Sequence, residues 1–279
     1  MESSSCVILG AARNVAEHLP KTLEKIQDIR KLWMRSAVVF AENDSHDSTR
    51  QQLKRFCEDN EHTHILTYEV LVERYKERTE RLAFVRNAMM TFIHSHVEYS
   101  KYDYILIVDM DGGLNTFKQE SLRLCFETTM PEWDALFTNN NGAYYDVWAL
   151  RSKALGIQFD CWDMYRHMIA NVPASPQQIK QLCIWDYQKH IPMEKAPIPV
   201  HSAFGGLGLY RLKKTVGCTY NGIATECTCK NMKFATQVPC WNVTCEHVSF
   251  HADMIKKHKA KLYIFPKLLI DTQAEHIKH

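Results

Sequence analysis

Two aspartates one residue apart, Asp109 and Asp111, carry the clearest chemical signal in this chain. They follow residues 105–108, an unbroken aliphatic run typical of a strand buried on both faces of a parallel sheet. The carboxylates are therefore expected at the carboxyl edge of the sheet, where open α/β folds bind their ligands. A turn at Gly112 and Gly113 can bring both acids onto one hard cation, so the sequence predicts a divalent metal that bridges a phosphate-bearing ligand. A simple capped strand end also explains this pattern.

A second acidic segment follows the strand predicted over residues 37–40. Glu42 and Asp44 are expected at the same sheet edge as Asp109, where carboxylates can accept hydrogen bonds from a base or from ribose hydroxyls. The alternative is structural, since Asp47 or Ser48 can cap the helix that is predicted to begin near residue 49.

Two arginines lie on the helix predicted over residues 78–96. Its apolar face includes Leu82, Val85 and Met89, and neither Arg81 nor Arg86 belongs to that stripe. Both are therefore available for surface pairing or for a ligand. Their position before an aspartate-rich site favours contact with phosphates or with a base.

Candidate metal ligands also occur near the end of the chain. His247 and His251 are spaced i, i+4 on a predicted helix, so they can share a face as metal ligands or as surface residues. Half of the ten cysteines lie within residues 218–245. The group formed by Cys227, Cys229, Cys240 and Cys245 allows zinc, disulfides or reduced thiols, because the paired Cys-x2-Cys spacing of a zinc knuckle is missing.

The elements that must position these residues alternate between strands and helices. Strands are predicted over residues 6–9, 37–40, 64–68, 105–108, 134–138, 207–212 and 261–265, and helices over 19–29, from 49, 78–96, 117–128 and from 245. The prolines at 192, 197 and 199 predict a loop. This order predicts an α/β, Rossmann-like fold whose mostly parallel sheet is flanked by helices.

The character of the chain changes near residue 140, where aromatic residues become dense. Trp148, Trp162 and Trp185 belong to this part. Most such aromatics form core, but their apolar faces and polar edges also suit stacking on sugar rings. We therefore place a boundary near residue 140 within one compact domain, and we expect the aromatic-rich half, 141–279, to contain a groove for a sugar acceptor.

Size and composition limit the possible functions. The chain has 279 residues, is 46% hydrophobic and carries a formal net charge of +2, so it can bury a core and has no charge signature for nucleic acid. No signal peptide and no apolar stretch of about 20 residues are evident, which predicts a soluble, cytoplasmic protein without a membrane span.

Taken together, these motifs resemble those of GT-A nucleotide-sugar glycosyltransferases. More specifically, the chain looks like the capsule-associated alpha-mannosyltransferase-like enzymes and the small soluble glycosyltransferases of large algal viruses. The matching residues, in chain order, are Arg13-Asn14, residues 42–49, Arg81 to Arg86, Asp109-x-Asp111, Tyr145-Asp146, residues 204–206 and Cys245-Glu246-His247. The Gly112-Gly113 pair departs from many relatives, which carry bulkier residues there.

The resemblance implies a fold, a cofactor and a set of roles. It implies that Asp111 and Asp109 hold Mn²⁺, or Mg²⁺, on the diphosphate of a donor such as UDP-xylose, UDP-glucose or GDP-mannose. It also makes 1–140 the nucleotide-sugar-binding half and 141–279 the acceptor-binding half. It also implies that the nucleoside contacts residues from the first three motifs, and that the acceptor is an oligosaccharide or glycoprotein. The spacing of the two histidines, and not the resemblance, adds His251 as a further candidate metal ligand. The residues assigned to the donor are Arg13, Asn14, Glu42, Asp44, Arg81, Arg86 and Asp109.

An inverting transfer needs a carboxylate beside the acceptor hydroxyl as general base. Glu246 is our choice, because it resembles the acid that this class places at a helix start near the acceptor; Asp186 and Asp146 are held in reserve. A retaining enzyme requires no such base, and both stereochemical outcomes stay open.

Two other functions compete with the hexosyl- or pentosyltransferase. Asp109-Met110-Asp111-Gly112 also looks like the first motif of haloacid-dehalogenase-type phosphatases, with Asp109 as nucleophile. That family usually carries Thr where this chain has Gly113, and the later acidic pair it needs is not found. The third possibility is a sugar- or nucleotide-binding module without turnover.

Overall fold

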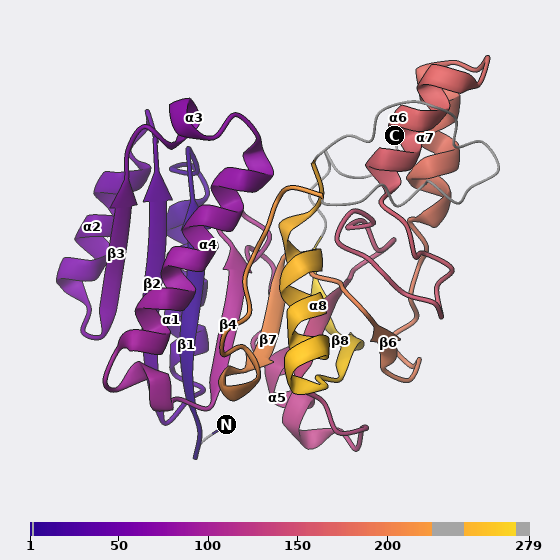
Figure 1. Cartoon of the computed structure of the whole chain (residues 1–279). Helices are drawn as coiled ribbons and strands as arrows, with labels where there is room; N and C mark the ends of the chain where they lie inside the picture. Colours follow the sequence, from indigo (N-terminus) through magenta and orange to yellow (C-terminus); the bar gives the residue numbers. More distant parts are fainter. Residues whose placement is uncertain (2, 225–242, 272–279) are drawn as a thin grey trace.

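A sheet of eight strands runs through the computed structural model, which describes residues 1, 3–224 and 243–271 (Figure 1). The strand order is β3-β2-β1-β4-β7-β5-β8-β6. The strands are β1 (Ser5–Ala12), β2 (Arg35–Asn43), β3 (Thr63–Tyr68), β4 (Tyr104–Asp109), β5 (Ala135–Asn140), β6 (Ile198–Val200), β7 (Leu207–Arg211) and β8 (Leu262–Ile270).

The first half of the sheet is parallel and the second half is mixed. Strands β3, β2, β1 and β4 pair in parallel, as do β5 and β8. Strand β7 is antiparallel to both of its neighbours, β4 and β5, and β6 is antiparallel to β8. The predicted α/β fold with helices on a mostly parallel sheet is confirmed, with β6 and β7 as its antiparallel members.

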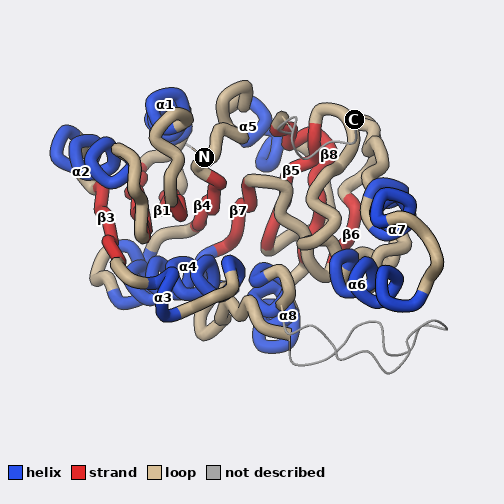
Figure 2. The backbone as a smooth tube through the Cα atoms, turned by 90° about the horizontal axis from the view of Figure 1, so that it is seen from above, coloured by secondary structure: helices blue, strands red, loops and turns tan. Residues whose placement is uncertain are grey.

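Helices cover both faces of this sheet, so the molecule has three layers (Figure 2). Helices α1, α2 and α5 lie on one face, and α3, α4 and α8 lie on the other. Each layer buries its own hydrophobic cluster against alternate strand residues, such as Ile8 on one side and Val7 on the other. The helices are α1 (Leu19–Arg30), α2 (Thr49–Asp59), α3 (Leu71–Arg74), α4 (Arg78–Ser95), α5 (Glu120–Glu127), α6 (Cys161–Asn171), α7 (Pro176–Cys183) and α8 (Glu246–His258).

Proline positions account for two differences from the sequence-based prediction. The proline-rich segment predicted as a loop contains β6, an edge strand in which Pro199 needs no ladder partner for its missing N–H. Strand β8 continues through Pro266, where the prediction ends a strand, and the register against β5 shifts there. Helices α6 and α7 were not predicted.

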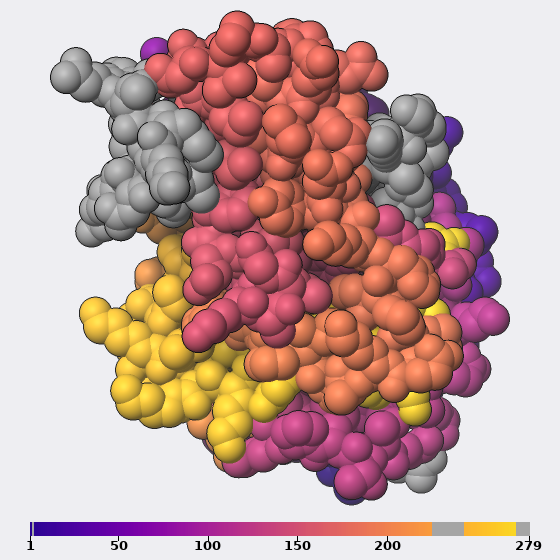
Figure 3. Space-filling model, turned by 90° about the vertical axis from the view of Figure 1, so that its right-hand side faces the viewer, coloured from indigo at the N-terminus to yellow at the C-terminus, as the bar shows by residue number. Residues whose placement is uncertain are grey.

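The two predicted halves share the sheet, because β7 from the later half lies between β4 and β5. Helices α6 and α7 pack together beyond the β6 end of the sheet (Figure 1). Viewed from that end, they form the upper part of the molecular surface, and the segment leading to β6 lies below them (Figure 3). The acid-bearing end of β4 is therefore flanked by elements from both halves.

Gly10 on β1 provides the space for the residue between the two aspartates. It pairs with Val108 of β4, and the buried Met110 side chain lies against it. A Cβ atom at Gly10 would lie 2.5 Å from Met110 Sδ. Met110 thus points into the core, whereas Asp109 and Asp111 on either side of it line the cavities at this end of β4.

We expect Gly10→Ala to destabilise the protein by about 1–3 kcal/mol, because the added methyl overpacks Met110. Denaturant unfolding measures the effect. Gly113→Ala is a control from the acid-pair loop, since its Cβ would meet nothing closer than 3.4 Å. Combining Gly10→Ala with Met110→Ala should cost less than the sum of the two single changes. A Gly10→Ala variant as stable as the natural protein would contradict this account.

Candidate active site

Two cavities meet at the end of β4 and form one cleft. The smaller, about 330 Å³, is the arginine arm, lined by Arg13, Asn14, His18, Asn43 and Arg81 among others. The larger, about 600 Å³, is the tryptophan arm, lined by Trp148, Trp162, Trp185, Asp146 and Glu246 among others. Both arms are lined by Arg78, Leu82, Arg86, Asp109 and Asp111. The predicted acid pair therefore lies where the two arms join.

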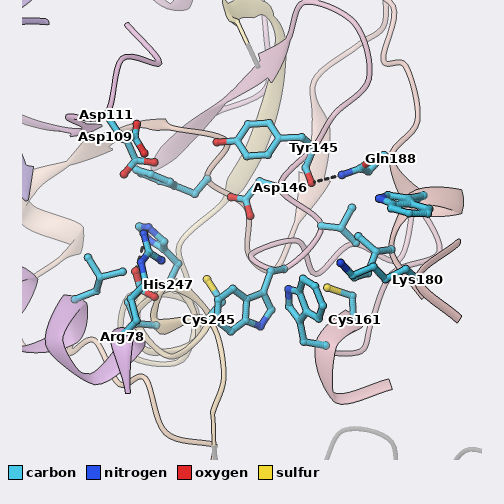
Figure 4. A pocket seen from close by; sticks show the side chains of 18 of the residues that line it. Arg78, Asp109, Asp111, Tyr145, Asp146, Cys161, Lys180, Gln188, Cys245 and His247 are labelled. Carbon is cyan, nitrogen blue, oxygen red and sulfur yellow. Dashed lines mark hydrogen bonds and ion pairs between the residues drawn. The ribbon is translucent and has the colours of Figure 1, made fainter. Parts of the chain in front are cut away.

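Asp109 and Asp111 lie side by side at this junction (Figure 4). Asp109 ends β4, and its backbone N–H donates to Gly206 O at 2.9 Å. Gly112 follows with a φ of +97°, a conformation that favours glycine, and a Cβ there would lie 2.8 Å from His18 Nδ1. The turn at Gly112 explains locally why the carboxylates of Asp109 and Asp111 lie on the same side of the sheet edge.

The charges at the junction fit a divalent cation. Burial, and then the charge of Asp111, raise the pKa of Asp109 to about 7, and Arg86 opposes this shift. Carboxylate oxygens are the donors that Mn²⁺ and Mg²⁺ prefer. Among the described residues no group of three or more His, Cys, Asp or Glu side chains could hold a metal. A cation here would need oxygens from a ligand or from water besides the two acids.

Arg86 of α4 connects the junction to the tryptophan arm. Its guanidinium pairs with Glu246 through Nη1 and with Asp109 Oδ1 through Nη2 at 3.3 Å. The ring of Phe204 lies 5.3 Å from the guanidinium carbon. Arg86 and Glu246 are both buried, so each charge depends on the other for compensation.

The arginine arm concentrates positive charge. Arg81 donates to Tyr75 O at 2.6 Å and to Lys76 O at 2.8 Å, and burial followed by the charge of Arg13 lowers its pKa. The buried Nε of Arg13 has no hydrogen-bond partner among the described residues. Such an arrangement suits an anionic ligand. Sequence reasoning missed Arg78, although its i, i+8 spacing from Arg86 indicated that both share a helix face.

Glu42 and Asp44 do not line either arm, so the structure does not place them against a nucleoside as predicted. Glu42 is fully buried; it pairs with Arg50 and accepts from the Ser45 backbone N–H at 2.9 Å. Asp44 accepts from the Val72 N–H at 3.1 Å. Their neighbour Asn43 lines the arginine arm instead.

The acidic segment after β2 holds the loop that carries Arg13. Thr49 Oγ1 accepts from the Val15 N–H at 2.8 Å, and Ser45 Oγ accepts from the Asn14 N–H at 3.0 Å. Asp47 accepts from the backbone N–H of Thr49, at the start of α2, at 2.9 Å. Ser48 is the N-cap residue of α2 but makes no side-chain capping bond, whereas Asp47, one residue earlier, accepts from the first N–H of the helix, so the structural alternative holds for Asp47 only in this form. The predicted residues Arg13 and Asn14 are thus positioned in the arm by their neighbours.

His251 is not brought to the acid pair, which corrects its assignment as a metal ligand. Its two ring nitrogens bond to Ser202 Oγ at 2.9 Å and Tyr210 Oη at 3.0 Å, and it lines neither arm. The side chain has no exposed surface, and burial lowers its pKa to about 3. His247 lines the tryptophan arm, and neither of its ring nitrogens has a hydrogen-bond partner among the described residues.

Two of the three candidate bases lie in the tryptophan arm. Glu246 is the first residue of α8. Asp146 accepts from the backbone N–H of Ala149 at 3.2 Å and of Gly205 at 3.0 Å, which fixes its carboxylate. Asp186 is exposed, accepts from Gln181 and lines neither arm, so the structure does not support its assignment as a base.

The predicted zinc or disulfide cluster falls largely outside the described residues, because Cys227, Cys229 and Cys240 are not among them. The described cysteines, Cys245 included, are free thiols. No helix in the described part of the chain has the length and apolar character to cross a membrane.

No family model and no curated protein matches this chain. Solved structures resemble its fold at low identity. They include the mannosyltransferase PcManGT from Pyrobaculum calidifontis in complex with GDP-Man and Mn²⁺ (12% identity, TM-score 0.48, 97% of this chain and 57% of that one). A second is glucosyl-3-phosphoglycerate synthase from Mycobacterium tuberculosis with UDP (8% identity, TM-score 0.44, 96% of this chain and 69% of that one). A third is S. aureus TarS (10% identity, TM-score 0.45, 95% of this chain and 59% of that one). This chain spans less than two thirds of the length of the mannosyltransferase and of TarS.

Asp109→Asn should stabilise the metal-free protein as the pH rises. Because the folded-state pKa of Asp109 is raised to about 7, the folded chain holds a proton that the unfolded chain has lost between about pH 4 and pH 7. The stability of the natural protein therefore falls through that window relative to the variant. In EDTA the difference between the Tm of the variant and that of the natural protein should shift in favour of the variant by about 2–4 °C from pH 5 to pH 8, which corresponds to about 1 kcal/mol. A Tm difference independent of pH would contradict the charge crowding.

Proposed function

We propose that this chain is a metal-dependent glycosyltransferase of the GT-A class that moves a sugar from a nucleoside diphosphate to a hydroxyl of a glycan. The observation that carries the proposal is the position of Asp109 and Asp111 where the arginine arm and the tryptophan arm join. A transferase must bind two substrates that meet at one reacting carbon, and this cleft offers two arms that meet at one acid pair. The resemblance to capsule-associated enzymes is part of this proposal.

The donor nucleotide fits the arginine arm. The positive charges of Arg13, Arg78 and Arg81 complement a diphosphate, and Asn14 and Asn43 offer amides to a base or ribose. Asp109 and Asp111 would hold Mn²⁺ or Mg²⁺ on the diphosphate oxygens, where the cation stabilises the charge that develops on the leaving group. The sugar would then point into the tryptophan arm.

Glu246 and Asp146 face the acceptor in this arrangement. The bond between the anomeric carbon and the diphosphate oxygen breaks with its electron pair on the leaving group, and the acceptor oxygen forms the new bond. In an inverting reaction Glu246 takes the hydroxyl proton. Arg86 lines both arms, so a bound diphosphate competes with Glu246 for the guanidinium and leaves that carboxylate available.

Release of nucleoside diphosphate from a panel of nucleotide sugars with Mn²⁺, with and without mixed glycan acceptors, tests the function. A transferase releases the nucleotide faster with acceptor and forms a glycoside. Hydrolysis of a phosphomonoester with Mg²⁺ would favour the phosphatase, and saturable binding without product would favour the binding module. The two-armed cleft favours the transferase, because a phosphomonoesterase has no use for a second arm.

Asp111→Ala should reduce metal-dependent turnover by at least about 100-fold and weaken Mn²⁺ binding, because it removes one of two carboxylates at the proposed cation site. Titration calorimetry with Mn²⁺ and nucleoside diphosphate measures the binding. Circular dichroism should show an unchanged fold. Retained activity and metal affinity would reject the site.

Glu246→Gln should lower kcat by about 10²–10⁴-fold while donor affinity is kept, because glutamine preserves the shape but accepts no proton. Steady-state kinetics with both substrates varied provide the measurement. Asp186→Asn is the control from outside both arms and should leave turnover unchanged. A larger loss with Asp146→Asn would move the base to Asp146, and a mild effect of both changes would indicate retention of configuration.

A further inference from the structure

The far end of the tryptophan arm has no part in the transfer step described above. Three of the six tryptophans, Trp148, Trp162 and Trp185, line this arm together with Lys180 and Gln188. Figure 4 shows Lys180 and Gln188 at the end opposite Asp109 and Asp111. The arm thus has an acidic end at the junction and an end that carries an amide and an ammonium group.

Trp148 is held so that it offers an apolar surface. Its indole N–H donates to Asp160 Oδ2 at 3.0 Å, which uses the only polar atom of the ring. Asp160 is itself buried, pairs with Arg151 at 3.2 Å and caps the start of α6. A fixed aromatic surface in a cleft suits the apolar face of a sugar ring and loses little conformational entropy on binding.

Lys180 contributes an uncompensated positive charge. Its ammonium lies 5.8 Å from the centroid of the Trp162 ring, and none of the described residues forms an ion pair with it. The neighbouring Asp186 accepts instead from Gln181. At the other end of the arm Asp109, Asp111, Asp146 and Glu246 would repel an anion. Arg78 and Arg86 also line that end, but Arg86 is already paired there with Asp109 and Glu246. Away from the proposed diphosphate site, a negative group on a ligand of this arm is therefore favoured most at the Lys180 end.

We propose that the acceptor is a glycan with an anionic substituent, a carboxylate or a phosphate, that binds Lys180 while its ring packs on the tryptophans. This inference rests on the proposed function and names its acceptor class. The reacting hydroxyl then lies near Glu246, and the anionic group lies toward the opposite end of the arm. Lys180 becomes a residue that determines specificity and does not take part in bond making.

Binding to an array of neutral, uronate-bearing and phosphorylated glycans tests the proposal, with the protein preloaded with Mn²⁺ and a nucleoside diphosphate. Lys180→Met removes the charge and keeps the aliphatic stem, and Lys180→Arg restores a charge. Lys189→Met is the matched control, because Lys189 is exposed and lines neither arm. Titration of tryptophan fluorescence then gives Kd for the best glycan and its neutral parent.

The natural protein should bind anionic glycans more tightly than their neutral parents, and more weakly as salt rises. Lys180→Met should weaken anionic binding by about tenfold or more and leave neutral binding unchanged. Lys180→Arg should retain most of the affinity, and Lys189→Met all of it. A comparison of the uronate-bearing with the phosphorylated glycans on the array shows whether the anionic substituent is a carboxylate or a phosphate.

Equal binding of neutral and anionic glycans, equal losses on both in Lys180→Met, or the absence of any bound glycan would overturn the acceptor assignment. If Mn²⁺ and nucleoside diphosphate still bind in those cases, only this inference fails. Failure of the natural protein to bind Mn²⁺ with any nucleoside diphosphate would instead overturn the proposed function and this inference with it.

Discussion

The ion pairs of Arg86 hold the cleft together. This guanidinium from α4 contacts Asp109 at the end of β4 and Glu246 at the start of α8, which are far apart in the sequence. A buried arginine is stable only when it is paired, so its burial requires both helices to keep their places against β4. Arg86 and Asp109 line both arms of the cleft, so this contact forms part of the wall that the two arms share.

Strand β7 is the second constraint on the site. Its approach, Phe204-Gly205-Gly206, contacts both halves of the acid cluster: the Gly205 N–H donates to Asp146, and Gly206 O accepts from the N–H of Asp109. An antiparallel strand between β4 and β5 is what brings this segment back to the carboxyl end of β4. The fold thereby joins residues of the two predicted halves around one junction.

Residues at the ends of long apolar runs could be predicted from the sequence, and residues whose role depends on distant partners could not. Asp109, Asp111 and Glu246 were predicted because strand ends and helix starts meet at one sheet edge, whatever the remaining topology. Arg86, in the middle of α4, was predicted because it does not belong to the apolar stripe of its helix. His251 bonds to Ser202 and Tyr210, 49 and 41 residues away in the chain, and no local pattern reveals that its nitrogens are used. Glu42 was likewise predicted to contact a nucleoside because it is an acid at a strand end, but its carboxylate pairs with Arg50 in the interior. Strand direction was also hidden, since an apolar run such as β7 looks the same in either direction.

The charges along the cleft favour one orientation for the nucleotide-sugar donor that we propose. Arginines line one arm, and the junction adds Asp109 and Asp111, beyond which Asp146 and Glu246 follow. A diphosphate cannot approach these carboxylates without a cation between them, whereas neutral sugar hydroxyls can donate hydrogen bonds to them. Burial, and then the charge of Asp111, raise the pKa of Asp109 at this junction, so a second negative charge is unfavourable there. For the donor that we propose, electrostatics therefore favours phosphates toward the arginine arm and the sugar toward Asp146 and Glu246, because the reverse orientation would place like charges together.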